Sequence, residues 1–151
     1  MAIAVAITES YPVRRRLSAM RGKVTAMTGR VVHFEIPADD FGRASEFYRS
    51  AFGWEITDVP DIGYAMLGTT PSDENGSPTE SGSINGGMLK RDADRKSPIV
   101  TIDVDDIEQA LAKINELGGR MVMPRQEVMG MGYSAYFADS EGNLMGLWQN
   151  A

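Results

Sequence analysis

The chain has 151 residues and a formal net charge of −6, with 42% apolar and 24% charged residues, which is an ordinary composition for a soluble globular protein. It has no cysteine, which excludes disulfides, thiolate nucleophiles and thiolate metal sites, and its single histidine, His33, excludes a site with two or three histidines from one chain. No apolar run approaches the roughly 20 residues that a membrane-spanning helix needs.

Charge is unevenly distributed along the chain. Residues 1–29 carry five basic residues and one acid, whereas residues 30–151 carry ten basic and twenty acidic residues. A body this acidic disfavours phosphate-backbone binding, so we expect no nucleic-acid partner. The start of the chain lacks the charged-then-apolar order of a signal peptide, and we expect a cytoplasmic protein. Residues 1–29 are interpreted as a basic arm, either loose or packed on the acidic body of a partner subunit.

Regular patterns begin at Arg30, where a strand rich in β-branched residues is predicted over 30–36 and ends before Pro37. A helix is predicted from about Asp40, with Asp39 or Asp40 as its N-cap and Gly53 as its stop. Further strands are predicted over 54–59, 63–69 and 83–90, with a polar loop over 70–82.

The same order of patterns restarts after a charged linker over 91–98. A strand over 98–104 precedes a second helix, for which Asp105 and Glu108 offer a capping box and which ends at Gly118-Gly119. Three more strands are predicted over 120–124, 133–138 and 143–149. The segment 126–133 carries two glycines around a methionine, which is typical of either a flap that closes over a ligand or a tight connection between strands.

These two halves form an internal repeat of about 60 residues, because their helices align without a gap. Each half has one helix and four strands, which is too little to close a core alone. We therefore expect an α+β fold of two tandem βαβββ modules, over 30–90 and 99–151, in one structural domain. The strands should form a curved, cup-shaped mixed sheet with the helices on its outer face, and a small-molecule site should lie at the junction of the modules.

Polar side chains on the first strands of the two modules are the candidates for chemistry. His33 and Glu35 share a face of their strand, as do Thr101 and Asp103. An imidazole titrates near neutrality, so His33 is a candidate acid–base residue that Glu35 could orient or whose pKa it could raise. The alternative is a histidine that is satisfied by one hydrogen bond and has no catalytic task.

Apolar side chains on the other strands are candidates for the walls of the cup. Leu144, Gly146 and Trp148 share a face, which makes Trp148 the first candidate for a pocket aromatic, with Tyr133 as a second wall. About half of the aromatic and methionine side chains on these strands should pack against the helices instead, given the alternation of strand faces. The remaining candidates for either role are Trp54, Tyr64, Met66, Met88 and Tyr136.

Two motifs extend this interpretation: Glu46-Phe47-Tyr48-x-x-x-Phe52-Gly53-Trp54 in the first module and Asp139-Ser140-Glu141-Gly142-Asn143 before the last strand. With the βαβββ repeat over residues 30–150, they resemble the vicinal oxygen chelate superfamily, which includes glyoxalase I, bleomycin-resistance proteins and extradiol dioxygenases. The resemblance implies divalent-metal ligands on the first and last strands of each module. Those four positions fall on His33, within Asn85-Gly86-Gly87, on Thr101 and on Gly146.

One strong ligand out of four does not hold a hard divalent ion, so we expect no metal and no cofactor, with His33 the only plausible ligand. The resemblance then implies a glyoxalase-like protein that binds, or turns over without metal, a small and partly apolar organic molecule in the cup. His33 and Glu35 would be its polar or catalytic anchors, and the remaining contacts would come from Thr101, Asp103, Tyr133, Gly146 and Trp148.

Two other functions are open at this point. One is a metal-dependent lyase, isomerase or dioxygenase whose ligands come partly from a second subunit. The other is a resistance protein that binds a cationic antibiotic stoichiometrically, which the acidic body would suit. A homodimer is expected in each case, and the sequence leaves open whether the protein is an enzyme.

Overall fold

The computed structural model describes residues 29–151, and the expected basic arm lies, except for Gly29, outside the described residues. The first module contains β1 (Val31–Ala38), α1 (Phe41–Phe52), β2 (Glu55–Val59), the short helix η1 (Pro60–Ile62), β3 (Tyr64–Gly68) and β4 (Gly86–Lys90). The second contains β5 (Ile99–Asp103), α2 (Ile107–Glu116), β6 (Arg120–Val128), β7 (Gly132–Ala138) and β8 (Leu144–Asn150).

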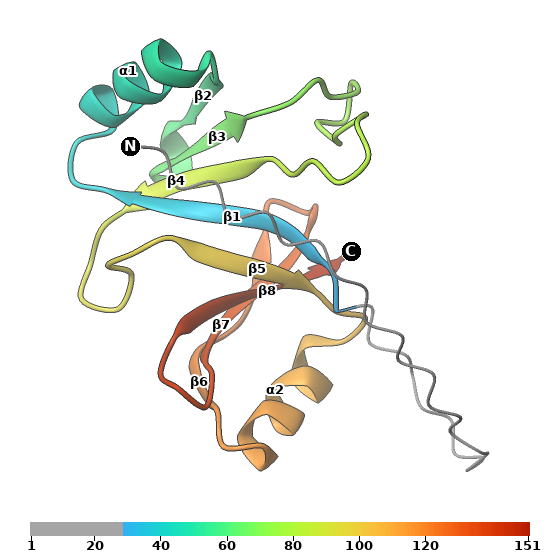
Figure 1. Ribbon diagram of the computed structural model, residues 1–151. Coiled ribbons are helices and arrows are strands. Elements are labelled where there is room, and N and C mark those ends of the chain that lie inside the picture. The colour runs from blue at the N-terminus through green and yellow to red at the C-terminus, as the bar shows by residue number, and fades with distance from the viewer. Residues whose placement is uncertain (1–28) are drawn as a thin grey trace, which may run out of the picture.

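The eight strands form one mixed sheet in the order β2-β3-β4-β1-β5-β8-β7-β6. In each module the first strand pairs in parallel with the last, β1 with β4 and β5 with β8, and the modules join through the antiparallel pair β1–β5. The two halves therefore lie on either side of the β1–β5 pair, with α1 over one and α2 over the other (Figure 1). The expected α+β architecture of two βαβββ modules with a curved sheet is confirmed.

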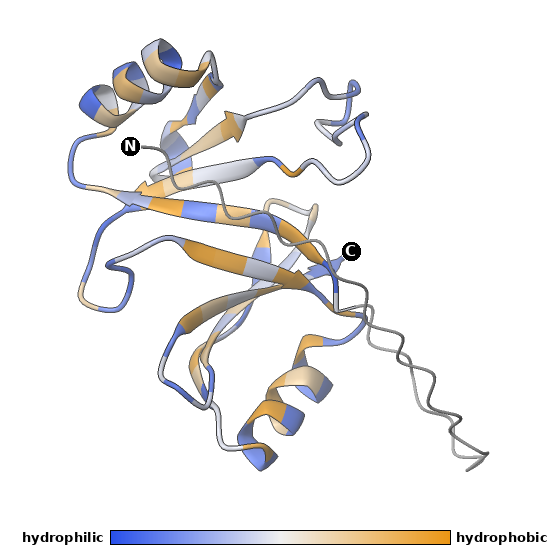
Figure 2. Cartoon of the chain, in the orientation of Figure 1, coloured by the Kyte–Doolittle hydropathy of each residue, from blue (hydrophilic) through white to orange (hydrophobic). Residues whose placement is uncertain are grey.

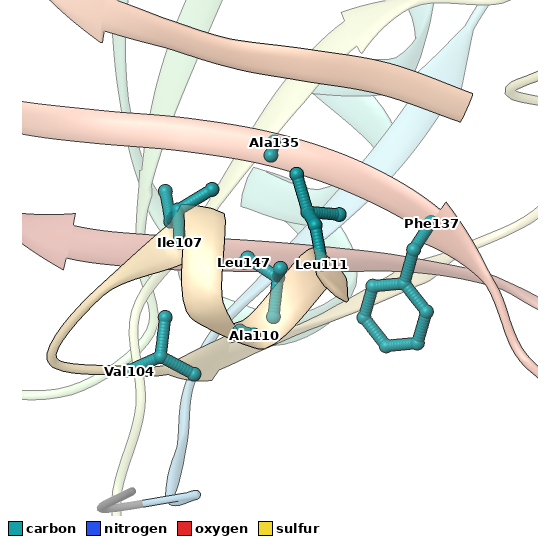
Figure 3. Packing of buried hydrophobic residues seen from close by; sticks show 7 residues of the cluster. All are labelled: Val104, Ile107, Ala110, Leu111, Ala135, Phe137 and Leu147. Atoms are coloured by element: carbon teal, nitrogen blue, oxygen red, sulfur yellow. The ribbon is translucent and has the colours of Figure 1, made fainter. Parts of the chain in front are cut away.

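Each helix packs its apolar side on its own half of the sheet, and this divides the core in two. Figure 2 shows the two helices with hydrophobic and hydrophilic residues alternating along their turns, as amphipathic helices require. In the second module, α2 contributes Ile107, Ala110 and Leu111 to a cluster with residues of β7 and β8 (Figure 3). In the first, Phe41, Ala44 and Tyr48 pack on a buried cluster made by Ala38, Ile56, Ala65, Leu67 and Met88.

The helix starts agree with the predicted caps in one module and differ in the other. Asp40 caps α1 by accepting a hydrogen bond from the Arg43 backbone at 2.9 Å, and Gly53 ends the helix in the left-handed region at φ 70°. In the second module the cap is Asp106, which accepts from the Gln109 backbone at 3.0 Å, and not Asp105. The predicted capping box is therefore wrong by one residue.

The predicted end of a strand at Pro124 is also wrong. β6 is an edge strand that runs on to Val128, and its pairing with β7 is irregular between Met123 and Gln126, where the proline, which has no N–H, is accommodated. Met129 at φ 49° and Gly130 at φ 69° then form the centre of a β-turn closed by a hydrogen bond from the Met131 N–H to the Val128 carbonyl at 2.9 Å, and Val128 pairs with Gly132 across it. Of the two expectations for this segment, the tight connection is the one observed.

Within the described residues, no helix is both long and apolar enough to cross a bilayer.

Candidate functional site

The candidate site lies on the face of the sheet opposite the helices, which we call the cup face, and it begins at the alternation of β1. Phe34 and Ile36 point toward the first core, so His33 and Glu35 lie on the other side of the strand. The pairing of β1 with β5 contains an irregularity between Val31 and His33, after which His33 lies opposite Thr101. Such a bulge changes the direction in which the following side chain projects.

Tyr64 connects His33 to Glu35. Its hydroxyl oxygen lies 2.8 Å from Nε2 of His33, and the hydroxyl donates to Oε1 of Glu35 at 3.2 Å. Because Tyr64 has one proton to donate and gives it to Glu35, the His33 Nε2–H donates to the Tyr64 oxygen. Tyr64 can reach these residues from β3 because Gly87 of the intervening β4 has no side chain: a Cβ there would lie 1.7 Å from the Tyr64 hydroxyl.

Tyr136 reaches the same carboxylate from the second module. Its hydroxyl donates to Oε2 of Glu35 at 2.5 Å, although the two residues are 101 positions apart. On the sheet, Tyr136 pairs with Gly146, Gly146 with Thr101, and Thr101 with His33, so the row that leads from Tyr136 to His33 contains a glycine and a small side chain. Glu35 therefore receives one phenol from each module, and the four side chains His33, Glu35, Tyr64 and Tyr136, which we call the central cluster, form one continuous hydrogen-bonded chain.

Burial controls the ionisation of this cluster. Glu35 is 8% exposed, and the loss of water raises its pKa, an effect that the hydrogen bonds from Tyr136 and Tyr64 and the charge of Arg95 oppose. Burial lowers the pKa of His33 to about 4, opposite to the raised pKa that was one of the expectations, so the imidazole is neutral near pH 7. Burial and the neighbouring Glu35 raise the pKa of both tyrosines far above their usual range, which keeps them as donors.

A buried carboxylate with a raised pKa, held by two neutral phenols and linked to a neutral imidazole, is suited to accept or deliver a proton. The chain from His33 through Tyr64 to Glu35 gives that proton a hydrogen-bonded route.

The remaining residues predicted for the site are divided between the two faces. Thr101 is 7% exposed and lies beside His33 on the cup face, and its Oγ1 lies 2.7 Å from the position that a Cβ of Gly146 would take. Asp103 is 8% exposed and forms an ion pair with Arg30 at 3.3 Å. It lies two residues beyond Thr101 on the same face of β5. Asp103 thus belongs to the contact between the start of the described chain and β5.

The two predicted aromatic walls lie on opposite faces. Trp148 pairs with Asp103 and Ser134 on the cup face, and its indole N–H donates to Asn150 at 2.9 Å. Tyr133 packs against the second core on the helix side, with the Arg125 guanidinium 3.4 Å above its ring. The structure therefore does not bring Tyr133 together with the central cluster.

Two parts of the site were not assigned from the sequence. Tyr64 and Tyr136 were among the possible cup-lining residues, but nothing in their spacing placed both hydroxyls on Glu35. Arg95 lies in the linker 91–98, for which the sequence predicts only a charged connection, although Asp92 three residues before it is a local signal for a fixed arginine.

The residues at the four implied metal positions do not fit a divalent ion. His33 Nε2 and both oxygens of Glu35 are engaged by tyrosine hydroxyls, and the Tyr64 hydroxyl takes the space of a side chain at Gly87. Gly146 offers no side-chain donor, and Thr101 offers only a hydroxyl. Across residues 29–151, no group of three or more His, Asp or Glu side chains is placed to hold a metal.

A surface depression of about 740 Å³ lies between β2, β3 and the loop 69–76. It reaches the cup face at Met66, which is 43% exposed and pairs with Gly87. Asn85 fixes the loop, because its amide donates to Ser72 and to the Gly76 carbonyl and its oxygen accepts from the Thr69 backbone. This depression is apart from the central cluster and adds open space at the rim of the cup.

Comparisons with known sequences agree with this architecture. A family model described as bleomycin resistance protein-like N-terminal matches residues 30–70. The anthracycline biosynthesis protein DnrV of Streptomyces peucetius is 24% identical over 137 residues, which cover 80% of this chain and 47% of that protein. A glyoxylase-like domain-containing protein of Didymella fabae is 27% identical, with 76% of this chain and 89% of that protein covered. The chain thus spans about half the length of the first of these relatives.

Solved structures share the fold. Methylmalonyl-CoA epimerase of Streptomyces coelicolor, in complex with 2-nitronate-propionyl-CoA, matches with a TM-score of 0.58 and 18% identity over 83% of this chain and 99% of that one. A glyoxalase/bleomycin resistance protein/dioxygenase superfamily member from Vibrio splendidus matches with a TM-score of 0.53 and 18% identity over 82% of this chain and 100% of that one.

Proposed function

We propose that the chain is a member of the vicinal oxygen chelate superfamily, and that it binds a small, partly apolar organic molecule on its cup face and transfers a proton to or from it without a metal. Relatives with the same fold include an epimerase whose structure holds an acyl-CoA analogue, which supports a carbonyl-containing ligand for this chain. Membership in a fold family does not select a reaction, so the proposal depends on the central cluster.

The observation that carries the proposal is the position of Glu35. It is a buried carboxylate in the middle of the cup face, with one tyrosine donor from each module and a link through Tyr64 to the only histidine. A purely structural carboxylate in the core would be costly to bury, and an apolar residue would fill the same space at lower cost. A buried carboxylate that is held by neutral donors is instead well suited to acid–base chemistry.

In this proposal Glu35 accepts a proton from a carbon next to a carbonyl group of the ligand, and the electron pair of the broken C–H bond moves toward the carbonyl oxygen. Tyr64 and Tyr136 hold the carboxylate in place. His33, neutral at pH 7, completes the hydrogen-bonded chain through which the proton returns to solvent or to the ligand. Trp148 and Met66 supply apolar surface on the same face.

A second function has its own support. One relative takes part in anthracycline biosynthesis and the family model is named for bleomycin resistance, which favours stoichiometric binding of a bulky antibiotic-like molecule. The acidic body of residues 30–151, with twenty acidic and ten basic residues, would attract a cationic compound. Such a binder would hold its ligand without exchanging the ligand's protons.

Deuterium exchange in D₂O separates these functions. Chelator-treated protein would be incubated with propionyl-CoA and methylmalonyl-CoA, and loss of the α-proton signal would be followed by NMR. We expect catalysed exchange in the unmodified protein and in Arg120→Gln, an exposed charge change on β6, and a loss of about 100-fold or more in Glu35→Gln.

Exchange that survives in Glu35→Gln, or that the chelator abolishes, would contradict the proposal. Tight binding of an anthracycline together with no exchange of any thioester would favour the second function.

A further inference from the structure

The linker 91–98, between the two modules, contains an arginine that is held in a fixed conformation. Arg95 donates through Nε to Oδ2 of Asp92 at 2.8 Å, and its Nη2 contacts the same oxygen. The other oxygen, Oδ1, accepts the backbone N–H of Arg95 at 2.7 Å and of Asp94 at 3.0 Å. Arg95 and Asp92 therefore form a closed local clamp, which removes most of the freedom of a long side chain.

The clamped arginine lies close to the β1–β5 junction, where the central cluster begins. In the linker, Arg95 is the one residue that is not exposed, with 27% of its side chain accessible. It precedes Ile99 by four residues, and Ile99 pairs with Glu35 across the β1–β5 junction. The guanidinium lies near enough to Tyr136 and Glu35 to lower the pKa of both groups.

Arg95 has guanidinium N–H donors that Asp92 does not use. A guanidinium has five N–H groups in a planar fork, and Asp92 uses the Nε hydrogen and one on Nη2. Among the described residues no carboxylate binds the Nη1 side. A planar pair of donors of this kind matches the two oxygens of a carboxylate.

Resting on the function proposed above, we propose that Arg95 binds a carboxylate of the ligand at the edge of the central cluster, so that the natural ligand is a small organic acid with an apolar part. Tyr136 would donate from the other side once the ligand displaces part of its hydrogen bonding. Asp92 is then a positioning residue that acts through Arg95.

The charge of Glu35 opposes this binding, so the affinity for an anion should change in opposite directions when Glu35 and Arg95 are neutralised. An anion beside the Glu35 carboxylate is repelled, whereas Arg95 attracts it. Neutralising Glu35 should therefore strengthen binding of an anion, while neutralising Arg95 should weaken it. Binding of a neutral molecule of the same shape should respond to neither change.

Phenylacetate and phenylacetamide are suitable probes, because they have the same apolar part and differ in charge. Their affinities would be measured by NMR titration, following the ring signals of Tyr136 and Tyr64. We expect Arg95→Gln to weaken phenylacetate binding by about tenfold and Glu35→Gln to strengthen it by roughly threefold, with phenylacetamide changed by less than about twofold in both. Arg95→Lys should retain part of the affinity, and Asp92→Asn should lose part of it.

Arg120→Gln removes the same charge at an exposed position of β6 and is expected to leave both affinities unchanged. Equal binding of the two probes in the unmodified protein, or an effect of Arg95→Gln no larger than that of Arg120→Gln, would overturn this inference and leave the proposed function standing. Binding of neither probe at the tyrosines would also overturn this inference, whereas the deuterium-exchange experiment decides the proposed function independently.

Discussion

At the scale of single residues, two glycines and two tyrosines account for the difference between this cup and a metal site. Gly87 and Gly146 stand at or next to positions that the superfamily resemblance assigns to metal ligands, and the Tyr64 hydroxyl takes the space that a side chain at Gly87 would need. Tyr136, paired with Gly146, reaches the same carboxylate. At Gly87, therefore, the space that a metal-binding side chain would need is occupied by a tyrosine hydroxyl.

Tyr136→Phe tests the hydrogen bond that joins the modules. The Tyr136 hydroxyl lowers the pKa of Glu35, so its removal should raise that pKa further and should cost about 1 kcal/mol of unfolding free energy. The pKa would be read from the carboxyl carbon signal of Glu35. Tyr133→Phe is the matched control, since Tyr133 lies on the helix side. An unchanged or lowered pKa in Tyr136→Phe would contradict the hydrogen bond.

His33 should make the protein sensitive to mild acid. Its pKa is lowered from 6.5 to about 4, so the unfolded chain binds a proton there that the folded chain does not. Stability should fall as pH decreases from 6.5 toward 4, by up to about 3 kcal/mol from this group. The raised pKa of Glu35 has the opposite effect, because it increases the stability of the folded protein as pH falls through that raised value.

Comparison with His33→Gln isolates the histidine contribution, because both proteins keep Glu35. As pH falls from 6.5 to 4.5, the unfolding free energy of His33→Gln should increase relative to that of the unmodified protein, as measured by urea denaturation. A difference that is constant across this range would mean that the His33 pKa is not lowered.

The part of the site that could not be predicted also belongs to this scale. Alternation along β1 was sufficient to place His33 and Glu35 on one face. The convergence of Tyr64 and Tyr136 on Glu35 depends on the curvature of the sheet and on the parallel pairing of β1 with β4, which no local pattern encodes. Tyr133 and Tyr136 show the difficulty. They lie on opposite faces of strand β7, and the pairing of β7 with β8 determines which of the two faces the cup.

At the scale of elements, the strands were predictable wherever one face carried an apolar pattern, and the errors occurred at their ends. Asp105 and Asp106 are chemically equal caps, and only the φ and ψ of the observed chain select Asp106. Pro124 predicted a strand end, but an edge strand tolerates proline where its N–H is not needed. Such choices are made by tertiary pairing rather than by local preference.

Strands β3 and β4 provide a matched pair of glycine substitutions. Gly87→Ala places a Cβ within 1.7 Å of the Tyr64 hydroxyl and should displace Tyr64 from Glu35, whereas Gly68→Ala meets only an ordinary contact at 3.4 Å from Glu55. We expect the first to lower unfolding free energy by about 1 to 3 kcal/mol and the second to change it by less than about 0.5 kcal/mol. Equal effects in urea denaturation would show that Tyr64 is not held over Gly87.

At the scale of the whole molecule, two similar modules meet at β1–β5, and the central cluster takes residues from both. Glu35 and Tyr64 belong to the first module and Tyr136 to the second, so the site exists only when the modules are joined. The homodimer expected from the sequence stays a prediction. Sedimentation should give a species of twice the 16.5 kDa chain mass, and a monomer at micromolar concentration would contradict it.

The most direct test of a metal-free central cluster uses the single histidine, since every imidazole signal of an untagged protein comes from His33. Its nitrogen and proton signals would be recorded by NMR from pH 8 to 3.5 in two separate samples. One sample contains a chelator, and the other contains one equivalent of Ni²⁺ and no chelator. We predict a pKa of about 4 and signals that the metal leaves unchanged. A pKa near 6.5, or stoichiometric broadening of the imidazole signals by Ni²⁺, would contradict the central cluster as described.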